Sequence, residues 1–251
     1  MRPIVFLHIP KTAGQAIHHE LTRCVGKRNV SRIRAHSAVP NGTTNLPQGY
    51  LLHSGHIDWP DIDTLPADRF VFSVLRDPLE RIASFYFYIL KEAKALSPQE
   101  LASPQQTGKR ISLTHSVDDY FFGGDPGWQR FILDHYDNFY CSYFATQMMR
   151  GRHKLQGLSA EEQITQAAAG ARGINAIYHI DDLAALEADA LRELGLTIHI
   201  AGNYANAGPH TRSEQRWPKL VERLERDDSV ARIEGFATRD YDLMRRLGLP
   251  T

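Results

Sequence analysis

The sequence has few cysteines and no long uninterrupted apolar run. Its only thiols are Cys24 and Cys141, too few for a disulfide scaffold, and their spacing matches no metal-binding motif. The most apolar region, residues 70–90, is interrupted by the charged side chains Arg76, Asp77, Glu80 and Arg81. A membrane-spanning helix needs about 20 consecutive apolar residues, so none is predicted.

The sequence also lacks an excess of charge of either sign. Its 29 Lys and Arg residues balance 29 Asp and Glu residues, for a formal net charge of +0. Without a global positive field, the chain has no general attraction for nucleic acid or for an anionic membrane surface. Met1 and Arg2 lead directly into a strand-like run, with no secretory signal pattern. We therefore expect a cytoplasmic protein that binds neither nucleic acid nor membrane.

Strand-like and helical segments alternate along the 251 residues. This alternation predicts an α/β fold, with a central parallel sheet covered by helices on both faces. No internal repeat or linker is present, so residues 1–251 are predicted to form one domain. The predicted strands are 4–7, 69–75, 176–180 and one that starts with residues 50–52 and ends in residues 53–56. The predicted helices are 14–25, one starting near residue 78, 116–122, 128–135, 160–172 and 183–194, with further helix in the C-terminal tail. The predicted loops are 38–48, 97–112 and 203–212.

The turn after the first predicted strand is the most informative segment. A strand, a tight turn and a helix start gather free backbone N–H groups and the positive end of the helix dipole around an anion. Lys11 adds a positive charge inside this turn. The order differs from the nucleotide P-loop, because the lysine precedes the single glycine. A purely structural helix-start turn is the alternative. The candidate anion-binding residues are Pro10, Lys11, Thr12, Ala13, Gly14, Gln15 and Ala16.

A second anion-binding segment follows the buried strand at residues 69–75. Arg76 ends this strand, Asp77 and Pro78 turn the chain, and Ser84 lies eight residues beyond Arg76 on the next helix. Arginine can grip a phosphate through two hydrogen bonds, and serine can add a hydroxyl donor. An arginine paired with a local acidic residue is the alternative. In parallel sheets, ligands bind beyond the carboxyl ends of the strands, where both turns are predicted to lie.

These two segments together resemble the sulfotransferases that use PAPS (3′-phosphoadenosine 5′-phosphosulfate). Pro-Lys-Thr-Ala-Gly is similar to their 5′-phosphosulfate loop, and Arg-Asp-Pro-x-x-Arg-x-x-Ser to their 3′-phosphate motif. The likeness is greatest to the branch of heparan sulfate 2-O-sulfotransferase and bacterial relatives. It implies a three-layer, P-loop NTPase-like sulfotransferase fold, PAPS as co-substrate, PAP as product and no required metal. It also implies that Lys11 stabilises the leaving group.

His56 is the candidate base. The unperturbed pKa of histidine, about 6.5, suits proton abstraction near neutral pH. In the resembled branch a Gly-His pair after the second strand supplies the base, and Gly55 and His56 occupy the corresponding place. His53 is the weaker candidate. A strand-end histidine bonded to a backbone carbonyl is the structural alternative.

Three further assignments depend on the resemblance. Relatives carry hydroxyl residues after the loop glycine, whereas this chain has Gln15 and Ala16. Thr211 and Arg212 lie where relatives have a loop that closes over PAPS. The His-Ile-Asp-Asp segment, residues 179–182, is interpreted as a strand-to-helix junction with Asp182 as the helix N-cap, and not as a metal site.

The acceptor is expected to be a glycan or another small molecule. Two basic stretches, residues 23–34 and 150–154, could line a groove for an anionic glycan, although charge runs are usually solvated surface. The aromatic residues that could stack on sugar rings are Trp59, Tyr86, Tyr88 and Tyr143. The rival functions are a P-loop kinase-like ATP phosphotransferase and a non-catalytic nucleotide- or glycan-binding protein. The oligomeric state is left open.

Overall fold

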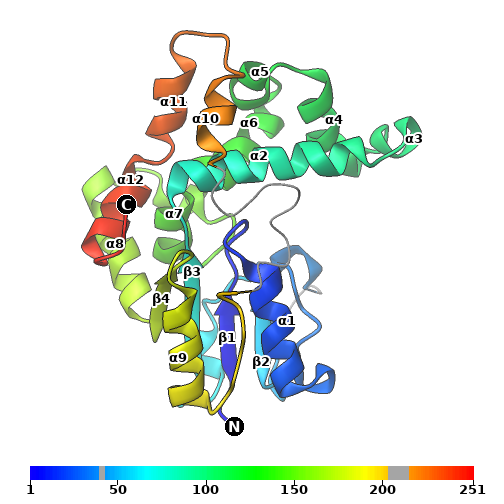
Figure 1. Cartoon of the computed structure of the whole chain (residues 1–251). Coiled ribbons are helices and arrows are strands. Elements are labelled where there is room, and N and C mark those ends of the chain that lie inside the picture. Colours follow the sequence, from blue (N-terminus) through cyan, green and yellow to red (C-terminus); the bar gives the residue numbers. More distant parts are fainter. Residues whose placement is uncertain (40–42, 203–214) are drawn as a thin grey trace.

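Four parallel strands form the central sheet of the computed structural model, which describes residues 1–39, 43–202 and 215–251. The strands are β1 (Ile4–Leu7), β2 (Leu52–Gly55), β3 (Phe70–Leu75) and β4 (Ala176–His179). Their order is β2-β1-β3-β4, so β1 pairs with both β2 and β3. Because all pairings are parallel, the carboxyl ends lie at one edge of the sheet, which faces α2 (Pro78–Lys94) in Figure 1.

Helices occupy most of the remaining described chain. The other α-helices are α1 (Gly14–Val25), α3 (Pro98–Leu101), α4 (Thr107–Thr114), α5 (Val117–Phe122), α6 (Pro126–Tyr136), α7 (Phe139–Thr146), α8 (Ala160–Arg172), α9 (Leu183–Leu194), α10 (Trp217–Val221), α11 (Ser229–Gly235) and α12 (Thr238–Arg246). Short 3-10 helices are η1 (Lys27–Asn29), η2 (His36–Ala38), η3 (Ile62–Thr64), η4 (Pro104–Gln106) and η5 (Arg152–Leu155). The predicted bounds of α1, α8 and α9 are confirmed, and Asp182 caps α9 by accepting from the Ala185 N–H at 3.3 Å.

The sheet is the middle of three layers. Side chains alternate along β1, so that Ile4 and Phe6 pack with α1 and α9 while Val5 and Leu7 pack with α7, α8 and α12. Figure 1 shows these helices on opposite faces of the sheet. The prediction of an α/β fold with a covered parallel sheet is confirmed. The assignment of residues 1–251 to one domain stays a prediction.

Strand β2 begins later in the chain than predicted. The expected strand began at Tyr50 and ended in residues 53–56, whereas pairing with β1 runs from Leu52 to Gly55. Its residues His53 and Ser54 are polar and nevertheless buried. The prediction followed the apolar residues, whereas the ladder with β1 determines which residues pair.

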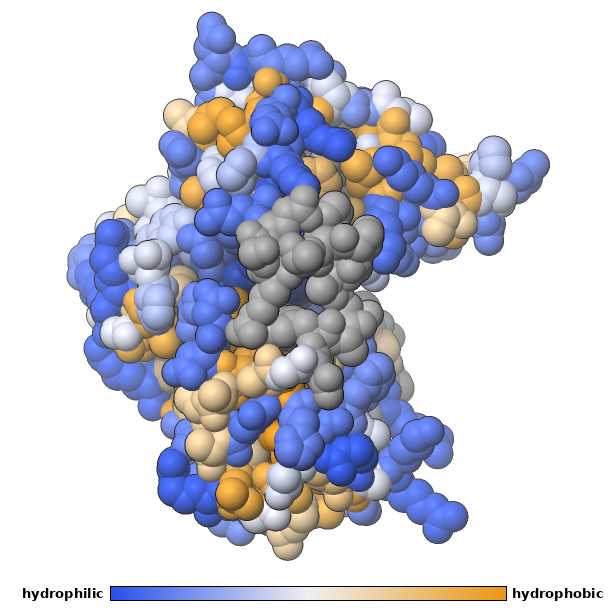
Figure 2. Space-filling view, in the orientation of Figure 1, coloured by the Kyte–Doolittle hydropathy of each residue, from blue (hydrophilic) through white to orange (hydrophobic). Residues whose placement is uncertain are grey.

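Beyond the carboxyl edge of the sheet lies a helical region with its own core. Helices α2, α5, α6, α10 and α11 contribute buried residues to one cluster that includes Ile82, Tyr86, Tyr120, Trp128 and Leu220. At the right of Figure 2 the surface is hollowed between this region and the part that contains the sheet.

The prediction of a surface loop at residues 97–112 is wrong. The segment forms α3, η4 and the first part of α4. Ser97 and Glu100 form a reciprocal capping box at the start of α3, and Ile111 packs against the core of the helical region. The two prolines, Pro98 and Pro104, each stand at the first turn of a helix, where proline is tolerated.

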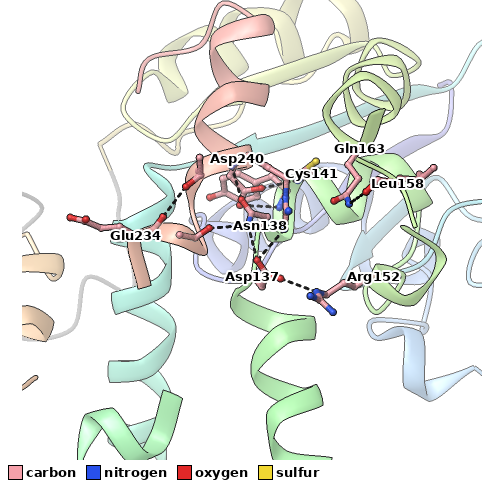
Figure 3. A network of polar contacts seen from close by, with 12 residues as sticks. Asp137, Asn138, Cys141, Arg152, Leu158, Gln163, Glu234 and Asp240 are labelled. Carbon is pink, nitrogen blue, oxygen red and sulfur yellow. Dashed lines mark hydrogen bonds and ion pairs between the residues drawn. The ribbon is translucent and has the colours of Figure 1, made fainter. Parts of the chain in front are cut away.

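Helix α7 was not predicted, although most of its residues are buried. The Asp240 carboxylate of α12 accepts the Tyr140 and Cys141 N–H groups at 3.2 and 2.8 Å, which satisfies the free donors at the start of α7. Figure 3 shows this cap beside Asp137, whose carboxylate pairs with Arg152 at 2.8 Å and with Arg239 at 3.2 Å. The sequence pattern missed α7 because it is apolar on all sides.

None of the helices in the described ranges has the length and apolar character needed to cross a membrane.

We predict that Gly170→Ala destabilises the protein by about 1–3 kcal/mol, a typical cost of overpacking. A Cβ at Gly170 in α8 would overlap the backbone oxygen of Phe144 in α7, so the two helices would have to separate. Urea denaturation measures the change. The matched control is Gly173→Ala at the end of α8, where the nearest neighbour of a Cβ lies at 3.2 Å; it should change stability much less. Equal effects of the two substitutions would contradict this account of the α7–α8 contact.

Candidate functional site

The turn between β1 and α1 has the backbone of an anion site. Lys11 and Ala13 both adopt left-handed conformations, with φ of 75° and 62°, which are costly for residues with a side chain. Across the described chain, no N–H group of residues 11–16 donates a hydrogen bond to another residue. The Thr12 hydroxyl is buried and donates to the Ile9 carbonyl at 2.9 Å. Free N–H groups at a helix start favour an anion.

Lys11 faces helix α2. Its Nζ lies 4.2 Å from the centroid of the Tyr88 ring, close enough for a cation–π interaction. Burial lowers the pKa of Lys11 to about 8, with further lowering by the positive charges of Arg216, Arg76 and Lys91. Several cations therefore converge on this turn, and an anion bound there would relieve their mutual repulsion.

Arg76 follows β3 directly, as predicted. Its Nη2 pairs with Glu80 Oε2 at 2.9 Å, so the expected alternative contact with a local acid is present. Glu80 also accepts the Arg216 and Trp217 N–H groups at 2.8 Å each. The carboxylate thus joins the start of α2 to the start of α10, and it orients one edge of the Arg76 guanidinium.

The start of α2 is fixed by local capping and by α7 and α12. Asp77 Oδ1 accepts the Glu80 N–H at 2.7 Å, and Asp77 Oδ2 accepts from the Tyr241 hydroxyl at 2.6 Å. The Tyr140 hydroxyl donates to the Arg76 carbonyl at 2.9 Å. These contacts hold the strand-to-helix turn in one conformation. Ser84 lies further along α2 and is buried.

His56 lies just beyond the end of β2, beside the Lys11 turn. Its Nδ1 donates to the His8 carbonyl at 2.7 Å, which is the carbonyl contact expected of a purely structural histidine. The same contact places the proton on Nδ1 and leaves Nε2 as a hydrogen-bond acceptor. Burial lowers the pKa of His56, although the His8 carbonyl raises it. Burial therefore favours the neutral form of His56, which is the form that can accept a proton.

Gly55 has a structural reason to be glycine. The backbone of Arg34 crosses directly over it, and a Cβ at Gly55 would overlap the Arg34 carbonyl. The His56 N–H donates to this same carbonyl at 2.9 Å. The Gly-His pair is thus the point where β2 and the segment before η2 meet.

His53 does not share this position. It is buried on β2, and neither ring nitrogen has a hydrogen-bond partner in the described chain. Burial lowers its pKa to about 4. His53 therefore stays neutral without the oriented tautomer that His56 has.

Two histidines beside these residues escaped the sequence analysis, and Arg34 was noted there only as part of the basic stretch at residues 23–34. The His8 ring packs 4.3 Å from the His56 ring, measured between centroids. His18 Nδ1 bonds Ser54 Oγ at 3.1 Å, and Arg34 donates to His18 Nε2. The only available signal for His8 was its place immediately before the Ile-Pro-Lys turn.

Most of the aromatic residues suggested for the acceptor are part of the protein core. Trp59, Tyr86 and Tyr143 are buried, whereas Tyr88 is 44% exposed and lies next to Lys11. In the second basic stretch, Arg152 pairs with Asp137 (Figure 3). Both residues line a cavity of about 150 Å³. Tyr88 is therefore the one of these four aromatic residues that is available to stack on a ligand.

The remaining predictions concern two cofactor contacts and the metal. Thr211 and Arg212 lie outside the described residues. Within the described ranges, no group of three or more His, Cys, Asp or Glu side chains could hold a metal ion.

Comparison with models of known protein families gives a match. The sequence model of a family described as "Sulfotransferase family" matches residues 2–154, which include the Lys11 turn, His56, Arg76 and Ser84. A search of curated proteins finds no match to the chain.

We predict that the Lys11 amine reacts with an acylating reagent with a midpoint near pH 8, the pKa that burial and the nearby cations produce. An unperturbed lysine titrates near 10.4. Mass spectrometry of the Lys11 peptide over a pH series measures this midpoint. A midpoint at the unperturbed value would show that Lys11 is neither desolvated nor surrounded by cations.

Proposed function

The chain belongs to the sulfotransferase family, and we propose that it transfers the sulfuryl group of PAPS to a hydroxyl of a carbohydrate or other small-molecule acceptor. The observation that carries the proposal is Lys11 inside a turn of free N–H groups, surrounded by further cations. The proposal extends to the branch that contains heparan sulfate 2-O-sulfotransferase. It also includes a cytoplasmic location, with which the two free cysteines agree.

Each of the two turns would bind one of the charged groups of the co-substrate. The N–H groups and side chains of residues 10–16 would hold the 5′-phosphosulfate, with Gln15 able to donate through its amide. Arg76 and Ser84 would hold the 3′-phosphate, and Arg216 adds positive charge nearby. The same proposal keeps Thr211 and Arg212 as contacts to the cofactor. Glu80 leaves part of the Arg76 guanidinium for the ligand, because it engages Nη2 alone.

In the proposed reaction His56 Nε2 takes the proton of the acceptor hydroxyl. The acceptor oxygen forms the new bond to sulfur while the bond from sulfur to the bridging oxygen breaks, roughly in line. Lys11 and the N–H groups of residues 12–16 stabilise the negative charge that grows on the bridging oxygen. PAP leaves with the electron pair. A sulfuryl group carries less negative charge than a phosphoryl group, so the proposal requires no metal.

The second candidate function is that of a non-catalytic PAP- or glycan-binding protein. It is favoured by Ala16, which offers no hydroxyl where relatives have one. Calorimetry with PAP, PAPS and ATP, with and without Mg²⁺, tests the alternatives. Metal-independent binding of PAP and PAPS supports the sulfotransferase, whereas Mg²⁺-dependent binding of ATP supports a kinase. Transfer from labelled PAPS to a panel of sugars and small alcohols then separates an enzyme from a binding protein.

Lys11→Ala should reduce turnover by about a hundred- to a thousandfold, a typical loss for one electrostatic stabiliser of the transition state. Turnover with saturating labelled PAPS measures the effect. The matched control is Lys91→Ala, which removes a cation that lowers the pKa of Lys11 but lies outside the turn. Near-normal turnover in Lys11→Ala would contradict the assigned role.

Arg76→Ala should weaken PAP binding at least tenfold, since a hydrogen bond to a charged group contributes about 1.5–3 kcal/mol. Binding of the analogue without the 3′-phosphate should change little. Calorimetry measures both affinities. Glu80→Gln is the control for loss of the Arg76–Glu80 pair. Equal losses for the two ligands in Arg76→Ala would assign Arg76 a structural role.

His56→Ala should reduce turnover about a hundredfold or more, with PAP affinity close to that of the wild type. The wild-type rate should rise with pH as His56 loses its proton, with a midpoint below about 6.5 because burial lowers the pKa of His56. This acidic limb should disappear in His56→Ala. Retained turnover would transfer the role to His53 or to a carboxylate.

A further inference from the structure

His8 is a buried histidine that touches both halves of the proposed site. It follows β1 and is 5% exposed. One side of its ring stacks on Phe6, with centroids 5.3 Å apart and an interplanar angle of 16°. Its centroid lies 4.3 Å from that of His56, with the two rings inclined by 35°. The His8 ring therefore limits the plane in which the His56 imidazole can lie.

The main chain of His8 also contacts His56 and the residue before it, Gly55. The His8 N–H donates to the Gly55 carbonyl at 3.1 Å, and the His8 carbonyl accepts from His56 Nδ1 at 2.7 Å. The first contact fixes the backbone next to His56 relative to His8, and the second fixes the tautomer of His56. The ring of His8 then restricts the remaining freedom of His56, which is rotation about its side-chain bonds.

His8 also contacts the start of the helix that follows the anion-binding turn. A Cβ at Gly14, the first residue of α1, would overlap the His8 imidazole at Nε2, Cδ2 and Cε1. Only a glycine allows the ring to lie this close to the helix start. His8 is thus packed between His56 and the turn that contains Lys11.

We infer that His8 is a positioning residue, whose ring fixes the orientation of the His56 imidazole and its separation from the Lys11 turn. The inference rests on the proposed function, because it assigns His56 the role of base. His8 transfers no proton in this account; it keeps His56 Nε2 directed toward the acceptor hydroxyl.

The charge around His8 agrees with a steric role. Burial lowers the pKa of His8 well below its usual value, and the nearby positive groups lower it further. The titratable and charged groups that act on His8 or His56 are Lys11, His18, Arg34, His36 and Arg81. None of these is acidic, so His8 stays neutral and does not stabilise charge in the reaction.

Three variants test the inference. His8→Ala removes the ring but keeps the backbone carbonyl, and His8→Phe keeps a flat ring without its nitrogens. His53→Phe is the matched control, because it replaces a buried neutral histidine of the neighbouring strand that is not stacked on His56. Sulfuryl transfer, PAP affinity and the NMR titration of His56 are measured for each.

We expect His8→Ala to lower kcat roughly ten- to a hundredfold, since small misplacements of a catalytic group have effects of this size. PAP affinity should stay within about threefold. Water entering the space should move the His56 titration, and the acidic limb of the rate, toward the ordinary pKa of histidine. His8→Phe should keep kcat within about threefold of the wild type, and His53→Phe should leave the His56 titration unchanged.

The inference is overturned if His8→Ala changes neither kcat nor the His56 titration, or if His8→Phe is as damaging as His8→Ala. An equal shift of the His56 titration in His53→Phe would also overturn it, by showing a general effect of the buried histidines. The NMR titration does not depend on turnover. Absence of sulfuryl transfer by the wild-type protein would therefore refute the proposed function alone, while the titration still decides whether His8 holds His56.

Discussion

The parallel pairing of β1 with β2 and β3 is the constraint on which the candidate site depends. Parallel strands end at the same edge of a sheet, so the turn after β1, the end of β2 and the turn after β3 are brought together. Lys11, His56 and Arg76 are far apart in sequence. His56 and Arg76 follow β2 and β3 directly, and Lys11 lies in the turn after β1. The helical region then covers this edge through α2, which places Tyr88 against Lys11.

This arrangement collects like charges in a partly buried space. Burial and the neighbouring cations lower the pKa of Lys11, and burial and Arg76 likewise lower the pKa of Arg216. Glu80 offsets part of the repulsion by pairing with Arg76 and accepting two N–H groups at the start of α10. The remaining positive charge is the physical basis for binding an anion with two separate charged groups, and it is maintained at a cost to stability.

Close backbone approach is the second requirement of the site. Gly14 admits the His8 ring to the start of α1, and Gly55 admits the Arg34 backbone to the end of β2. Neither glycine has a φ in the left-handed range. Glycine is therefore required at these two positions for space and not for backbone conformation. At the turn itself the reverse holds, because Lys11 and Ala13 adopt left-handed conformations although neither is glycine. Strain of this kind is typical of functional turns.

The sequence by itself determined the parallel α/β layers, the turn around Lys11 and the strand-end position of Arg76, because these depend on local periodicity and on the residues at strand ends. It also determined α1, α8 and α9, whose ends carry their own start and stop residues, such as Ser159 and Gly195. Only the tertiary structure decided the register of β2, the helical state of residues 97–112 and the existence of α7. In each case the deciding partner is distant in sequence: β1 for His53 and Ser54, α2 for α4, and Asp240 for α7. The same reason explains why His8 was missed, since its role comes from rings and backbone that the fold brings together.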